Sequence, residues 1–114
     1  MAKYEKRLRG DFQAFHDYLF DGILNGSMSA SYEDGSDWES SGVRCAVRVF
    51  ERYSWTGGNR VSMNLTLVGS GDELFLSAIT SGGSQAMFWK VNTIGEESFL
   101  DCVAGLTEQY AAGR

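Results

Sequence analysis

The sequence predicts an α+β fold in which an antiparallel meander sheet of about five to six strands carries an N-terminal and a C-terminal helix. Apolar and polar residues alternate from Val43 to Val49 and from Arg60 to Leu67, which is the pattern of strands with one buried face. Apolar residues recur at helical spacing from Phe12 to Asn25 and again beyond Ile94. The expected order is therefore strand, helix, about four or five strands and helix, in a single domain at 1–114.

Glycine-containing turns set the expected register of the sheet. Thr56-Gly57-Gly58 suits a three-residue loop, and Ser70-Gly71 and Gly82-Gly83 suit two-residue turns. An odd loop keeps the odd positions of both flanking strands on one face, and a slip of one residue would bury their polar set instead. The rows expected across four strands are Val47, Leu67, Leu74 and Val91; Val49, Leu65, Leu76 and Trp89; Glu51, Met63, Ala78 and Met87; and Tyr53, Val61, Thr80 and Gln85.

Local signals place the helices and the remaining segments. Asp11 is a candidate N-cap for the first helix and Gly26 a candidate stop, while a capping box at Thr93 and Glu96 starts the second helix near Ile94 to Glu96. Alternation predicts short edge strands at 4–8 and 28–32, and 33–42 is predicted to be a loop. The predicted buried stripes are Phe12, Phe15, Leu19 and Ile23 on the first helix, and Phe99, Cys102, Val103, Leu106 and Tyr110 on the second.

Composition excludes some classes of function. The 114 residues have a net charge of −5, which argues against general nucleic-acid binding. The N-terminal residues contain no apolar run, so we expect neither an export signal nor a membrane span. A cytoplasmic location is the expectation that follows. Cys45 on a strand and Cys102 on the last helix are expected to be reduced core residues. No His/Cys cluster is present, so we expect neither a metal site nor another cofactor.

A candidate ligand site lies at the end of the predicted sheet where both Gly-Gly turns fall. Glu51 and Tyr53 are expected just inside the core there, beside the small Ala78. Convergent polar groups over an apolar floor are typical of small-molecule sites. The alternatives are that turns simply require such residues, and that Glu51 either forms a structural ion pair with Arg60 or a helix residue or reaches solvent near the end of its strand. The candidate ligand-binding residues are Glu51, Tyr53, Asn59, Arg60, Thr80, Ser81, Ser84 and Gln85.

The opposite face of the predicted sheet carries arginines and large apolar residues. Arg44, Arg48 and Arg52 occupy successive outward positions, where they would either follow a phosphate-bearing partner or guard an edge. Several outward aromatic residues are expected to be covered by a helix or another subunit. The candidate interface residues are Phe50, Phe75, Ile79 and Phe88. His16 has no catalytic partner in the sequence and is expected to be a partly buried helix residue.

Architecturally, the predicted order resembles that of helix-grip folds and of TATA-binding-protein-like folds. The motifs Glu51-Arg52-Tyr53-Ser54, 56–62 (TGGNRVS) and 79–86 (ITSGGSQA) resemble those of a family of small, uncharacterised bacterial proteins. That resemblance spans nearly the whole chain and implies a cytosolic single domain without a known activity.

No catalytic constellation is recognisable in the sequence. The leading prediction is a non-catalytic binding protein that holds a small, partly apolar ligand at the Gly-Gly-turn end of the sheet. The alternative is a homo-oligomeric interaction module that uses the outer aromatic face, and an enzyme ranks third. No nucleic-acid or membrane partner is expected.

Overall fold

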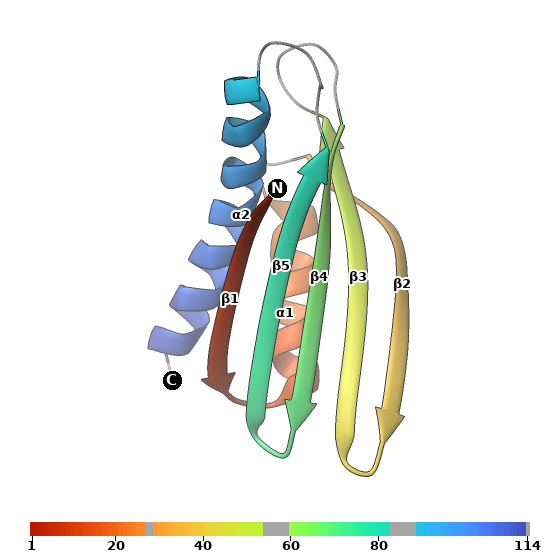
Figure 1. Ribbon diagram of the computed structural model, residues 1–114. Coiled ribbons are helices and arrows are strands. Elements are labelled where there is room, and N and C mark those ends of the chain that lie inside the picture. The colour runs from red at the N-terminus through yellow and green to blue at the C-terminus, as the bar shows by residue number, and fades with distance from the viewer. Residues whose placement is uncertain (27–28, 54–59, 83–88, 114) are drawn as a thin grey trace.

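A computed structural model describes residues 1–26, 29–53, 60–82 and 89–113, with side chains in the last helix described from Phe99 onward. The five strands form one antiparallel sheet in the order β1-β5-β4-β3-β2 (Figure 1). The α+β fold predicted from the sequence is thereby confirmed. The elements are β1 (Ala2–Arg9), α1 (Phe12–Asn25), β2 (Ser31–Ser40), β3 (Val43–Tyr53), β4 (Arg60–Ser70), β5 (Glu73–Gly82) and α2 (Trp89–Ala112).

Both helices pack against the same face of the sheet. In Figure 1, α1 lies behind the strands and α2 runs beside β1. Phe15 and Leu19 of α1 and Phe99 of α2 are fully buried in a cluster that includes Leu67 and Leu76 of the sheet. The single core therefore lies between the sheet and the two helices. We call the other side of the sheet the open face.

The first helix follows its predicted bounds. The backbone N–H of Ala14 donates a hydrogen bond of 2.9 Å to Asp11 Oδ2, which is the expected N-cap contact. Gly26 is the C-cap residue. Phe12, Phe15, Leu19 and Ile23 are buried, so the predicted stripe of α1 is confirmed.

The edges of the sheet differ from the expectation. The whole of β1 pairs with β5, so β1 takes the position that the sequence assigned to a strand at 85–91. Residues 85–88 lie outside the described residues, whereas Trp89–Val91 belong to α2, which begins five residues before Ile94. The predicted loop at 33–42 is also wrong over 33–40, because these residues belong to β2 and pair with β3 around an irregularity between Tyr32 and Asp34.

The register between β3 and β4 is shifted by one residue from the prediction. Phe50 lies opposite Met63 and Ala46 opposite Leu67, so the even positions of β3 face the core. Six residues separate the paired Tyr53 and Arg60, and an even number swaps the faces of consecutive strands. The structure thus buries Phe50 and leaves the β3 valines on the open face. The predicted loop 56–58 lies outside the described residues.

The register between β4 and β5 is shifted by two residues, which preserves the predicted faces. Ser70 pairs with Glu73, so the turn is Gly71–Asp72 instead of Ser70–Gly71. Gly71 has φ of +61°, which glycine adopts readily at the first position of such a turn. Leu74, Leu76 and Ala78 are buried as predicted.

Gly69 controls how closely α1 approaches the sheet. A Cβ at Gly69 would lie 2.7 Å from Phe12 Cδ2 and 3.1 Å from Leu74 Cδ2, both in buried side chains. We predict that Gly69→Ala lowers the free energy of unfolding by about 1–3 kcal/mol in urea titrations, because it overpacks this contact. The control is Gly105→Ala in α2, where a Cβ meets nothing within 4 Å. That substitution should add up to about 1 kcal/mol through helix propensity. Equal stability of the two variants would contradict the close packing of α1.

Candidate functional site

The open face is built from one residue in two along each of the five strands. Backbone pairing defines rows that cross the whole sheet, since directly opposed residues point to the same side. Three consecutive rows are Arg7, Phe75, Val68, Cys45 and Trp38; Glu5, Ser77, Thr66, Val47 and Ser36; and Lys3, Ile79, Asn64, Val49 and Asp34.

The first of these rows, which we call the Trp38 row, is the most apolar. Trp38 is 61% exposed although it is a large aromatic residue, and Ile79 in a nearby row is 40% exposed. Neither helix covers these side chains. Sequence reasoning missed Trp38 because 33–42 was predicted to be a loop, although Trp38 alternates with the acidic Asp37 and Glu39 on either side of it.

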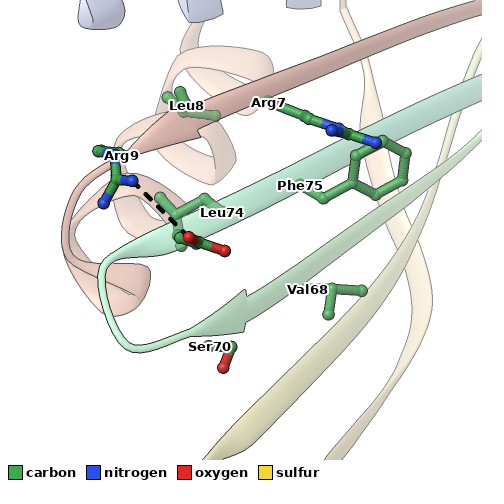
Figure 2. A pocket seen from close by; sticks show the side chains of 8 residues that line it. Arg7, Leu8, Arg9, Val68, Ser70, Leu74 and Phe75 are labelled. Atoms are coloured by element: carbon green, nitrogen blue, oxygen red, sulfur yellow. Dashed lines mark ion pairs between the residues drawn. The ribbon is translucent and has the colours of Figure 1, made fainter.

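A hollow of about 630 Å³ lies at the β1 end of the Trp38 row. Figure 2 shows the side chains that line it, with Arg7 extended toward the ring of Phe75, its partner on the neighbouring strand. Arg7 forms no ion pair with any described residue, whereas Arg9 Nη1 lies 2.9 Å from Asp72 Oδ1. The lining consists of Arg7, Leu8, Arg9, Val68, Ser70, Glu73, Leu74 and Phe75.

The predicted ligand residues are only partly brought together. Glu51 and Tyr53 lie on the open face, so their predicted position inside the core is wrong. The cause is the one-residue shift between β3 and β4, which turns the odd positions of β3 away from the helices. Arg60 Nη2 is 2.6 Å from Glu51 Oε1, and the Arg60 guanidinium lies 5.3 Å from the centre of the Tyr53 ring. Ser81 shares this face, whereas Thr80 is fully buried on the helix side. Asn59, Ser84 and Gln85 lie outside the described residues.

The predicted interface residues separate in the same way. Phe75 and Ile79 lie on the open face as expected. Phe50 is fully buried on the helix side, with ring centroids 5.5 Å from Phe20 and 5.8 Å from Tyr32, so its predicted outward position is wrong. Phe88 lies outside the described residues.

The three arginines of β3 also face the helices, which corrects their predicted outward position. The Arg44 guanidinium lies 4.2 Å from the centre of the Phe12 ring. Arg48 is 13% exposed and donates hydrogen bonds to His16 Nε2 at 3.1 Å and Asp37 Oδ1 at 2.8 Å, and also to the carbonyls of Val47 and Ser36. The hydrogen bond from Arg48 to Asp37 holds the pKa of the Asp37 carboxyl below its usual value. His16 is partly buried, as predicted, and acts as an acceptor in this network.

Arg52 differs from its two neighbours. Its Nε and Nη1 atoms are buried and have no hydrogen-bond partner among the residues that the structure describes. The guanidinium reaches from β3 toward α2, where it lies 5.9 Å from the centre of the Phe99 ring. Buried polar groups without a partner are rare in folded proteins because the lost hydration is not compensated. Arg52 is therefore a candidate site for an anionic group on the helix side of the sheet.

The two cysteines lie in different environments. Cys45 faces the open side, so its predicted inward position is wrong. Cys102 on α2 is half-buried, and burial raises the pKa of its thiol. Both are free, and the described residues contain no group of three His, Cys, Asp or Glu side chains that would hold a metal ion.

The fold and surface together define an antiparallel sheet that two helices cover on one side and that presents a mixed apolar and charged face on the other. The chain belongs to a family of unknown function (DUF6054), whose model matches residues 1–111. No curated protein and no solved structure matches the chain. Within the described residues, no helix is long and apolar enough to cross a membrane.

The Glu51–Arg60 pair lies at the surface, with the two side chains 26% and 52% exposed. We predict that Glu51→Gln lowers the free energy of unfolding by less than about 1 kcal/mol, because exposed ion pairs stabilise proteins weakly. Arg48→Met should cost more, about 2 kcal/mol, because it leaves Asp37 and two carbonyls without their donor. Urea titrations of both variants test this. A loss of about 3 kcal/mol in Glu51→Gln would instead indicate a buried pair.

Proposed function

We propose that this protein is a non-catalytic, homo-oligomeric interaction module whose open face docks on the open face of a second copy. The observation that carries this proposal is the Trp38 row, which places Phe75, Val68, Cys45 and Trp38 across an uncovered sheet. An antiparallel sheet that faces water on one side normally has polar residues there. A contiguous apolar patch with charged flanks is typical of an interaction surface.

The open face has the size of a stable protein–protein interface. Strands of about ten residues, with a rise of about 3.4 Å per residue and a spacing of about 4.8 Å, present about 800 Å² per copy. This equals the area that each partner contributes to an interface of standard size, which is about 800 Å².

The charges of the two edge strands favour a second copy as the partner. β1 contains four cations and one carboxylate, whereas β2 contains four carboxylates and no cation. Each copy therefore offers one basic and one acidic edge, which is a self-complementary distribution. Side-by-side pairing of two β2 edges would oppose like charges and is disfavoured.

We predict that Ile79→Glu dissociates the oligomer while leaving the monomer folded. Ile79 lies on the open face and is 40% exposed, so a carboxylate there is tolerated in water but not between two docked sheets. The matched control is Gly105→Glu, which adds the same charge at an exposed position on α2, away from the sheet. Light scattering coupled to size-exclusion chromatography measures the mass of each variant.

The expected result is a dimer for the unmodified protein and for Gly105→Glu, and a monomer for Ile79→Glu with an unchanged circular dichroism spectrum. A monomeric unmodified protein at about 100 μM would contradict the proposal, since stable interfaces of this size persist at such concentrations.

A second candidate function is the binding of a small, partly apolar ligand with an anionic group at Arg52. The observation that favours it is the pair of buried guanidinium nitrogens next to the Phe99 ring, which have no hydrogen-bond partner within the described part of the chain. A carboxylate would satisfy those donors, and an apolar tail would contact the aromatic ring. This relocates the predicted ligand from Glu51 to the helix side of the same strand.

We predict that octanoate raises the melting temperature of the protein and that Arg52→Met abolishes this effect. Octanol at the same concentration serves as the uncharged ligand, and Arg44→Met as the matched variant, because Arg44 already has Gln13 and Phe12 as partners. Without ligand, Arg52→Met should be at least as stable as the unmodified protein, since it removes an uncompensated buried charge. Equal stabilisation of the unmodified protein and Arg52→Met by octanoate would refute a site at Arg52.

A further inference from the structure

We infer that two copies are related by a two-fold axis running along β4 and that Trp38 of each copy fills the hollow beside Arg7, Val68 and Phe75 of the other. This inference rests on the proposed function and specifies its geometry. Trp38 and the hollow lie on the same row of the sheet, at opposite ends of that row.

The strand order determines which strands meet. β4 is the central strand of the order β1-β5-β4-β3-β2. A rotation of 180° about an axis parallel to β4, placed above the open face, exchanges the positions of β1 and β2 and those of β5 and β3. It leaves the height along the strands unchanged. Every row of one copy therefore lies over the same row of the other.

On the Trp38 row, this rotation brings complementary residues together. Trp38 lies over Arg7 of the other copy, Phe75 over Cys45, and Val68 over its own equivalent. The exposed indole thus meets the hollow of about 630 Å³, which is large enough to receive it. Arg7 has no ion-pair partner among the described residues, and its guanidinium gains the face of an aromatic ring. The dimer therefore contains two contacts between Trp38 and Arg7, one at each hollow.

The charged residues support the same axis. Lys3 and Asp34 occupy the two ends of one row, so the rotation places each over the other. Asp34 Oδ1 accepts a hydrogen bond from the backbone N–H of Gly35, which leaves the carboxylate at the surface. A two-fold axis perpendicular to the strands would instead place β1 over β1 and bring Lys3, Arg7 and Arg9 into a cationic cluster.

Sheet twist does not remove this correspondence. Aligned sheets pack at about 30° to one another, which displaces the edge strands by about 5 Å, or between one and two residues. The hollow extends along β1 from Arg7 to Arg9, so the indole remains over it where this displacement is directed toward Arg9.

The first test is the dissociation constant of Trp38→Ala, measured by sedimentation equilibrium. We expect it to weaken the dimer at least tenfold, because tryptophan side chains that fill a pocket are among the residues that contribute most to binding energy. Tyr53→Ala is the matched control, since Tyr53 is a similarly exposed aromatic residue of the open face that lies far from the hollow. It should change the dissociation constant less than threefold.

The second test locates the two-fold axis by cross-linking residues on the central strand. In a Cys45→Ser, Cys102→Ser background, Val68→Cys places one thiol per copy on the central strand, opposite its own equivalent. Because packed sheets lie about 10 Å apart, we expect a bismaleimide that spans about 10 Å to link two copies through this residue. Ser77→Cys in the same background stays unlinked, because it lies one strand from the axis and its two equivalents are about 14 Å apart.

The outcomes separate the inference from the proposed function. A dimer that Ile79→Glu dissociates but Trp38→Ala does not, or that never links through Val68→Cys, overturns the axis and leaves the docking of open faces intact. A dimer disrupted by inorganic phosphate, without any effect of Trp38→Ala, assigns the hollow to an anion and likewise overturns the inference. A monomeric unmodified protein overturns both.

Discussion

The parity of the side chains along β3 determines what each face of the sheet contains. With the even positions turned to the helices, Phe50 is buried in the core and forms an aromatic cluster with Phe20 and Tyr32 at its edge. Burying one such ring contributes about 1.5–3 kcal/mol of hydrophobic stabilisation. The same choice turns four apolar odd positions of β3 outward, namely Val43, Cys45, Val47 and Val49. The apolar open face is thus a direct consequence of how the core is built.

This parity also brings three arginines under the helices, where each has a different environment. Arg44 stacks on a ring and all three guanidinium nitrogens of Arg48 donate hydrogen bonds, so both have partners that compensate for lost hydration. Arg52 lies beside the Phe99 ring, and its Nε and Nη1 atoms have no hydrogen-bond acceptor among the described residues. Two features of the molecule therefore favour the binding of a partner, namely the Trp38 row on the open face and Arg52 on the helix side. Association of two copies would cover the first, and an anionic ligand would satisfy the second.

Local signals predicted the parts of the fold that local chemistry controls. Asp11, the stripe from Phe12 to Ile23 and Gly26 define α1 because capping and helical periodicity act within one segment. The faces of β4 and β5 were correct for the same reason. The pairing of β1 with β5 was not predictable in this way, since it joins residues about 70 positions apart, and a strand at 85–91 was equally consistent with local alternation.

The candidate site was predicted less well, because it depends on a single parity. Both faces of β3 contain apolar residues, since the valines lie on one face and Phe50 lies between arginines on the other. Hydrophobic patterning alone therefore favoured burial of the valine face, which is wrong. Arginine stems pack well against apolar surface, which makes Arg44 and Arg48 acceptable in the core-facing set. Glu51 and Arg60 were correctly paired as an alternative, whereas Trp38 was missed entirely.

The rate at which Cys45 reacts with a thiol reagent reports most directly on whether a second copy covers the open face, because this residue lies within the Trp38 row. In a Cys102→Ser variant, Cys45 supplies the only thiol of the chain. We expect ready modification in dilute protein and a rate that falls as protein concentration rises from about 1 μM to about 100 μM, since association covers the face by mass action. A slow rate at every concentration would place Cys45 in the core, and a fast rate at every concentration would mean that no second copy covers the open face.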